Sequence, residues 1–106
     1  MLRIAIPVNE KREDASISED FKKAKYFALV DVREGKTIRI NYMENKYIGK
    51  SASDISVYLA GFCVNVLLTQ GINERDVKAF ERVGISIEKG FKGPLNDALK
   101  EYLKKL

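Results

Sequence analysis

The feature that most constrains the fold is a short apolar run at residues 64–69, Val-Asn-Val-Leu-Leu-Thr. Apart from one asparagine, its residues are β-branched or apolar. This is typical of a strand buried on both faces of a parallel sheet, and the run is too short for an independent helix. The turn that follows contains Gly71, and Asn73 then precedes an acidic segment, as a helix N-cap does. We therefore predict a central strand that leads through a tight glycine turn into a helix, with backbone N–H groups directed at any ligand beyond the sheet edge.

Hydrophobic periodicity predicts the remaining elements. Alternating apolar residues predict strands at residues 2–8, 26–32, 38–43 and 85–88, and apolar residues at three- and four-residue spacing predict helices at 51–61, 74–83 and 94–106. Gly35 supplies a hairpin turn, Ser18 caps a short helical turn, and Pro94 takes the first position of the last helix. This order implies one α/β domain over residues 1–106, with a mixed five-stranded sheet and helices packed on it.

The amino-acid composition argues against several classes of enzyme and metal site. The chain has no histidine, so a conventional Ser-His-Asp or Cys-His nucleophile and a nitrogen-ligated zinc site are absent. The net charge of +4 is mild, and charged residues on exposed faces account for it. A single cysteine agrees with a reducing compartment, and no apolar run approaches the roughly 20 residues that span a bilayer. We expect a cytoplasmic protein that does not enter a membrane.

Six segments, in their order and spacing, resemble one known family. They are residues 4–8 (Ile-Ala-Ile-Pro-Val), 17–21 (Ile-Ser-Glu-Asp-Phe), 24–27 (Ala-Lys-Tyr-Phe), 64–71, 84–90 and 93–103. The family is that of dinitrogenase iron-molybdenum cofactor proteins, small carrier domains exemplified by NifX-like proteins and the C-terminal part of NifB-like proteins. The resemblance implies a three-layer ribonuclease H-like fold with helices on both faces of the sheet. It also implies a non-enzymatic protein that binds iron-sulfur or iron-molybdenum cluster precursors, with a metal-cluster donor or acceptor protein as partner.

The chain departs from the family at the implied site. Family members typically read Ser-Glu-His-Phe-Gly where residues 18–22 read Ser-Glu-Asp-Phe-Lys, so Asp20 replaces the histidine suspected as a cluster ligand. A second His-Gly-like segment is replaced at residues 49–52, and the glycine-rich turn is thinned to residues 70–73. Ligation through nitrogen is therefore not expected, and loss of cluster ligation from this chain stays an open interpretation.

Two segments remain as a candidate cofactor site, because the implied fold brings them to the same end of the sheet. The candidate residues are Ser18, Glu19, Asp20, Phe21, Lys22, Gln70, Gly71 and Asn73. Binding there would use backbone N–H groups, while the carboxylates are better explained by capping and solubility. Five lysines flank the first segment and would form a cationic rim if they converge: Lys22, Lys23, Lys25, Lys46 and Lys50.

Cys63 is the only side chain that could act as a soft metal ligand. It precedes the strand at residues 64–69, at the opposite end of the sheet from the candidate loops. Between Phe62 and Val64, a cysteine is more often a small buried hydrophobe, and we favour that interpretation.

Two other functions remain open. The fold suggests a nuclease or nucleic-acid binder, but Asp31 is an isolated carboxylate and no aromatic-basic stacking motif occurs, so nucleic acid is not the expected partner. The missing histidine favours a different alternative, a protein-interaction or regulatory module that has kept the fold without the cofactor.

Overall fold

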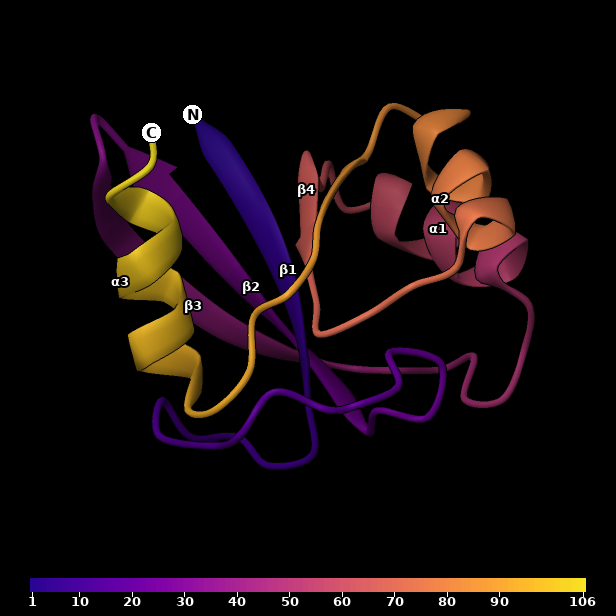
Figure 1. The fold of residues 1–106 in the computed structure, drawn as a ribbon, viewed down its shortest axis with the longest axis horizontal. Helices are drawn as coiled ribbons and strands as arrows, with labels where there is room; N and C mark the ends of the chain where they lie inside the picture. Colours follow the sequence, from indigo (N-terminus) through magenta and orange to yellow (C-terminus); the bar gives the residue numbers. More distant parts are fainter.

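The computed structural model describes residues Met1 to Leu106 and contains one five-stranded sheet (Figure 1). The strands are β1 (Leu2–Val8), β2 (Tyr26–Arg33), β3 (Lys36–Glu44), β4 (Val66–Leu68) and β5 (Ser86–Glu88), in the spatial order β3-β2-β1-β4-β5. The predicted central position of the apolar run at residues 64–69 is therefore wrong. β1 is the middle strand, because the β2–β3 hairpin extends the sheet on one side of it and β4 and β5 extend it on the other.

The sheet is mixed, as predicted. β1 pairs antiparallel with β2 and parallel with β4, and β4 pairs parallel with β5. β2 and β3 are joined through Glu34 and Gly35, which both have positive φ, 52° and 77°. A two-residue hairpin turn with positive φ at both positions matches the right-handed twist of the flanking strands.

Three helices connect or follow the later strands. They are α1 (Ala52–Ala60), α2 (Glu74–Glu81) and α3 (Leu95–Leu103). Ser51 and Asn73 are the N-caps of α1 and α2, and their side chains accept hydrogen bonds from the amides of Asp54 and Asp76. Pro94 lies one residue before α3 rather than at its first position, and its extended ψ of 143° makes it the cap residue. None of the three helices has the length and apolar character needed to cross a bilayer.

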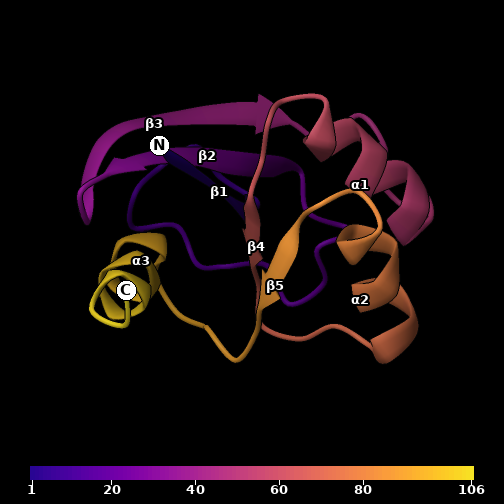
Figure 2. The same cartoon turned by 90° about the horizontal axis from the view of Figure 1, so that it is seen from above.

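Helices cover both faces of the sheet, because successive strand residues point to opposite sides. The even-numbered residues of β1, Ile4, Ile6 and Val8, pack in one core with α3, whereas Ala5 packs in a second core with α1 and α2. Figure 2 shows α3 apart from the α1–α2 pair. β4 is buried on both faces, since Val66 and Leu68 belong to the α3 core and Leu67 to the other. The burial predicted for the apolar run is therefore confirmed except at Asn65, which is exposed.

Candidate functional site

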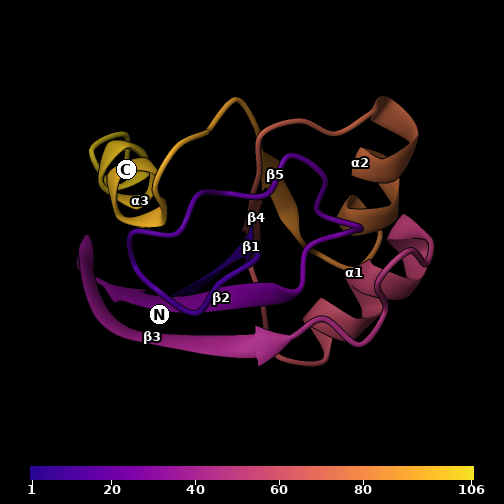
Figure 3. The same cartoon turned by 90° about the horizontal axis from the view of Figure 1, so that it is seen from below.

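β1 and β4 are parallel and end at the same edge of the sheet, which we call the lower end, as it is drawn in Figure 1. The β1–β2 loop, residues 9–25, and the β4–α2 turn, residues 69–73, both begin there. Figure 3 shows the β1–β2 loop crossing this end from the side of α3 to that of α2. The loop is anchored in the fold, because Ile17 bridges to Val8 and Ser16 bridges to Pro94.

The first candidate segment forms a side-chain-stabilised turn. The carboxylate of Asp20 accepts a hydrogen bond from the Lys22 amide at 2.9 Å, and its carbonyl accepts one from Lys23 at 3.0 Å. Ser18 donates its hydroxyl to the Asp20 carbonyl at 3.0 Å. The cap predicted at Ser18 is therefore wrong, because Asp20 caps this turn. The turn does not extend into a helix. A short carboxylate that binds the backbone two residues on is a common turn device.

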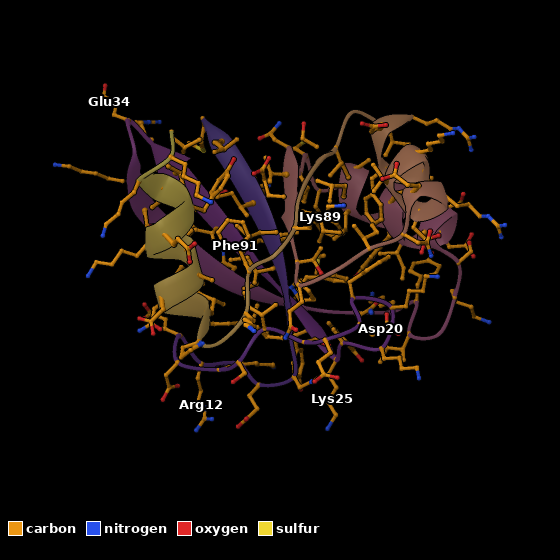
Figure 4. The ribbon with its side chains drawn as sticks, viewed as in Figure 1. Arg12, Asp20, Lys25, Glu34, Lys89 and Phe91 are labelled. Atoms are coloured by element: carbon orange, nitrogen blue, oxygen red, sulfur yellow. The ribbon has the colours of Figure 1, made fainter.

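Two side chains of this segment attach it to α2. Phe21 is buried, and its ring packs edge-to-face on Phe80 with centroids 5.4 Å apart. The ammonium of Lys22 lies 2.9 Å from the Asp76 carboxylate in the first turn of α2. Figure 4 shows Asp20 at the lower end, with Lys25 and Arg12, while Glu34 lies at the opposite end.

The second candidate segment lies against the first. The side-chain amide of Gln70 donates to the Ile17 carbonyl at 3.0 Å, and Asn73 accepts the Asp76 amide at 2.8 Å as the cap of α2. Gly71 is exposed, has no positive φ, and has open space where a Cβ would stand. The turn therefore does not require glycine, which corrects the tight glycine turn predicted from the sequence.

The two segments share one feature that favours binding of an anion. The amides of Glu19, Asp20 and Phe21, and those of residues 71–73, donate no hydrogen bond within the protein. Most other polar groups of the segments are engaged: Ser18, Lys22, Gln70 and Asn73 each bind a protein partner. Within the two segments, backbone N–H groups rather than side chains are therefore the free donors.

The lysines flanking the first segment meet a second loop, residues 45–50. The Gly49 amide donates to the Lys22 carbonyl, and the Asn45 amide donates to that of Lys25, both at 2.9 Å. These bonds bring the two lysine-bearing stretches of the predicted rim together. A hollow of about 370 Å³ at this end is lined by Lys11, Lys25, Tyr26, Glu44 and Ile48. None of the eight candidate residues lines it or any of the other three hollows.

Cys63 is exposed, so our interpretation of it as a buried hydrophobe is wrong. It lies in the turn between α1 and β4 with φ of 60°, in the left-handed region of backbone conformation. It lines a hollow of about 310 Å³ with Met1, Arg3 and Asn65. This hollow lies at the start of β1, so Cys63 is at the opposite end of the sheet from the candidate loops, as predicted. No group of three or more His, Cys, Asp or Glu side chains in the structure is placed to hold a metal ion.

Sequence reasoning missed a buried polar contact of the sheet. Asp31, which has no second carboxylate beside it, is buried and receives two hydrogen bonds from Arg3, at 2.6 and 3.2 Å. These bonds hold the pKa of Asp31 below its ordinary value of 3.8, against the opposing effect of burial. Arg3 and Asp31 are direct cross-strand partners in the β1–β2 pair. A correct prediction of the β1–β2 register would therefore have revealed the ion pair. Arg3 also donates to the Phe62 carbonyl at 2.7 Å, so its side chain links β2 to the turn after α1.

Known structures share this fold. PH0822 is 25% identical with a TM-score of 0.86, over 98% of this chain and 92% of its own. The apo orange protein of Desulfovibrio gigas is 22% identical with a TM-score of 0.85, over 99% and 89%. TM1290 of Thermotoga, provisionally assigned as a NifB protein, is 20% identical with a TM-score of 0.80, over 98% and 89%.

Sequence comparison identifies the family. No protein of curated function matches the chain. The model of one family, described as dinitrogenase iron-molybdenum cofactor, matches residues 2–105, nearly the whole chain. The resemblance seen in the sequence is thereby confirmed, and the chain belongs to the dinitrogenase iron-molybdenum cofactor family.

Proposed function

We propose that the chain is a non-catalytic carrier that binds an anionic iron-sulfur or iron-molybdenum cluster precursor at the lower end of the sheet. The observation that carries this proposal is the set of backbone amides without partners in residues 19–21 and 71–73. The family to which the chain belongs supports the identity of the cargo. We further propose that the cargo passes between this chain and a donor or acceptor protein.

The residues present fit an anion held by hydrogen bonds better than a cluster held by metal–ligand bonds. The chain has no histidine, and its single cysteine lies at the other end of the sheet. Thiolates and imidazoles are the ligands that iron prefers in such clusters. Amide N–H groups and lysine ammonium groups would instead stabilise the negative charge of a cluster whose terminal ligands come from outside this chain. We therefore propose that direct ligation has been lost in this chain.

An anaerobic titration with an iron-sulfur or iron-molybdenum cluster tests the proposal, followed by its visible absorbance. The proposal predicts saturable binding that is unchanged in Cys63→Ala. Binding should be weakened by the pair Lys22→Glu and Lys25→Glu, which reverses charge at the lower end. The pair Lys104→Glu and Lys105→Glu, which reverses the same amount of charge just after α3, is the matched control. Absence of binding by the unaltered protein, or equal loss in the control, would refute the carrier function.

One observation favours a second candidate, an interaction or regulatory module without cofactor. Ser18, Lys22 and Gln70 are engaged with protein partners, and no hollow opens over them. Under this alternative the lower end is a stable surface for another protein. The same titration separates the two functions, since the module binds no cluster.

We also propose that the fold is of the ribonuclease H-like type. The strand order β3-β2-β1-β4-β5, with helices on both faces, supports it. A nuclease activity is not proposed, because Asp31 is held by Arg3 and fold alone does not assign chemistry.

A further inference from the structure

A groove between α1 and α2 is lined by an unusual concentration of positive charge. It has a volume of about 290 Å³, and the α2 side presents Arg75, Lys78 and Arg82 while the α1 side presents Ser51 and Ser53. Figures 1 and 2 show α1 and α2 side by side, on the far side of the molecule from α3. The groove is thus separate from the hollows near β3 and Cys63.

The three cations form one stripe along the groove. They are three and four residues apart along α2, a spacing that places side chains on the same helix face. None of them forms a salt bridge. The one carboxylate in the groove, Asp76, is already paired with Lys22. Three like charges in one groove repel each other, so binding of an anionic partner relieves the electrostatic repulsion among them.

The rest of the lining suits an extended or helical chain that carries carboxylates. Ala52 and Ala79 provide its only apolar surface, so no bulky side chain blocks the groove. The hydroxyl of Ser51 accepts the Asp54 amide and keeps its own hydrogen to donate, and the Ser53 hydroxyl has no partner in the protein. Arginine and lysine are donors only. The groove therefore offers hydrogen-bond donors on both sides.

We propose that this groove docks a carboxylate-rich segment of a partner protein. This proposal rests on the proposed carrier function for the identity of the partner. The partner is the protein that delivers or receives the cargo. Asp76 connects the two surfaces, because it lines the groove and holds Lys22 of the candidate site. A segment docked on α2 lies next to the loop that carries the free amides.

The geometry favours protein carboxylates over nucleic-acid phosphates. The stripe extends about 10 Å along α2, from the 1.5 Å rise per residue of a helix. Carboxylates three and four residues apart on a partner helix have the same spacing as the three cations. Arginine binds carboxylates and phosphates alike through two parallel hydrogen bonds, so that contact does not separate the two partners. Single-stranded nucleic acid is usually bound on aromatic side chains, and the groove contains none.

The test uses a fluorescein-labelled helical peptide with glutamates at three- and four-residue spacing, and a matched peptide with glutamine in their place. Fluorescence anisotropy at low ionic strength should show binding of the glutamate peptide only. Arg75→Gln combined with Arg82→Gln should weaken it by about tenfold or more. Lys104→Gln combined with Lys105→Gln removes the same charge after α3 and should leave it nearly unchanged. Circular dichroism establishes that each variant is folded.

Four results would overturn the proposal: no binding to the unaltered protein, equal binding of the glutamine peptide, equal loss in the control variant, or tighter binding of a single-stranded oligonucleotide that depends on the same arginines. The cluster titration on the Arg75→Gln, Arg82→Gln protein separates this proposal from the carrier function. Loss of peptide binding with normal cluster binding supports both. If the unaltered protein binds the peptide but no cluster, the docking surface stands and the carrier function fails.

Discussion

Replacing Arg3 by methionine should destabilise the fold more than most surface changes, because it leaves the Asp31 carboxylate without a partner. Asp31 is 4% exposed and receives both its side-chain hydrogen bonds from Arg3. Breaking a buried ion pair by removing one partner costs about 3–5 kcal/mol. The Arg3 side chain is 31% exposed, so water reaches part of the pair, and we expect about 2–3 kcal/mol. For a domain of this size that is a fall in Tm of roughly 10–20 °C.

The pH dependence gives this prediction its sharpest test. In the folded protein the pKa of Asp31 is lowered from 3.8, chiefly by the hydrogen bonds from Arg3. The unfolded chain therefore takes up the proton first as pH falls, so the stabilisation is complete above about pH 5 and is lost as pH drops through the folded pKa. In Arg3→Met the carboxylate loses these bonds while burial still disfavours its charge, and protonation relieves the cost.

Urea unfolding at about pH 7 and about pH 3 measures both effects. The free-energy difference between Arg3→Met and the unaltered protein should be large at neutral pH and much smaller in acid. The double variant Arg3→Met, Asp31→Asn should recover part of the loss, because it removes the unpaired charge. A neutral-pH difference below about 0.5 kcal/mol, or one of the same size in acid, would refute the reasoning.

Three further predictions concern single sites. Asn73→Ala should cost about 1 kcal/mol in urea unfolding, because the Asp76 amide loses its cap, and an unchanged midpoint would contradict that role. Phe80→Ala should cost about 3–5 kcal/mol, since its ring is fully buried against Phe21; a cost near that of an exposed site would mean the second core is not packed as described. Cys63 should react with a thiol-specific dye in the folded protein nearly as fast as in urea, and protection from the dye would show that the thiol is covered.

Element type was predictable because it depends on neighbours in the chain. The alternation of Ile4, Ile6 and Val8 with smaller residues marks a strand wherever that strand lies in the sheet. Asn73 acts as an N-cap through the amide of a residue three positions on, so its role was visible in the sequence. The run at residues 64–69 was correctly read as buried on both faces, but burial alone does not say how many strands lie on each side.

The candidate site was predictable only in outline. Residues 18–22 and 70–73 do lie at one end of the sheet, because loops that follow parallel strands share an edge. The bonds of Lys22 to Asp76 and of Gln70 to Ile17 could not be predicted, nor could the exposure of Cys63. Each depends on where the β1–β2 loop or the α1–β4 turn lies once the sheet has formed.

The sequence by itself therefore determined the family, the order of strands and helices, and the absence of imidazole ligands, all of which follow from residue type and short-range spacing. Only the tertiary structure decided that β1 is the middle strand, that Arg3 pairs with Asp31, and that three cations of α2 face a groove beside α1. The β1–β4 neighbours and the Arg3–Asp31 partners are separated by tens of residues in the chain. Their meeting depends on how hydrophobic burial closes the sheet and its helices together, and local pattern does not encode that.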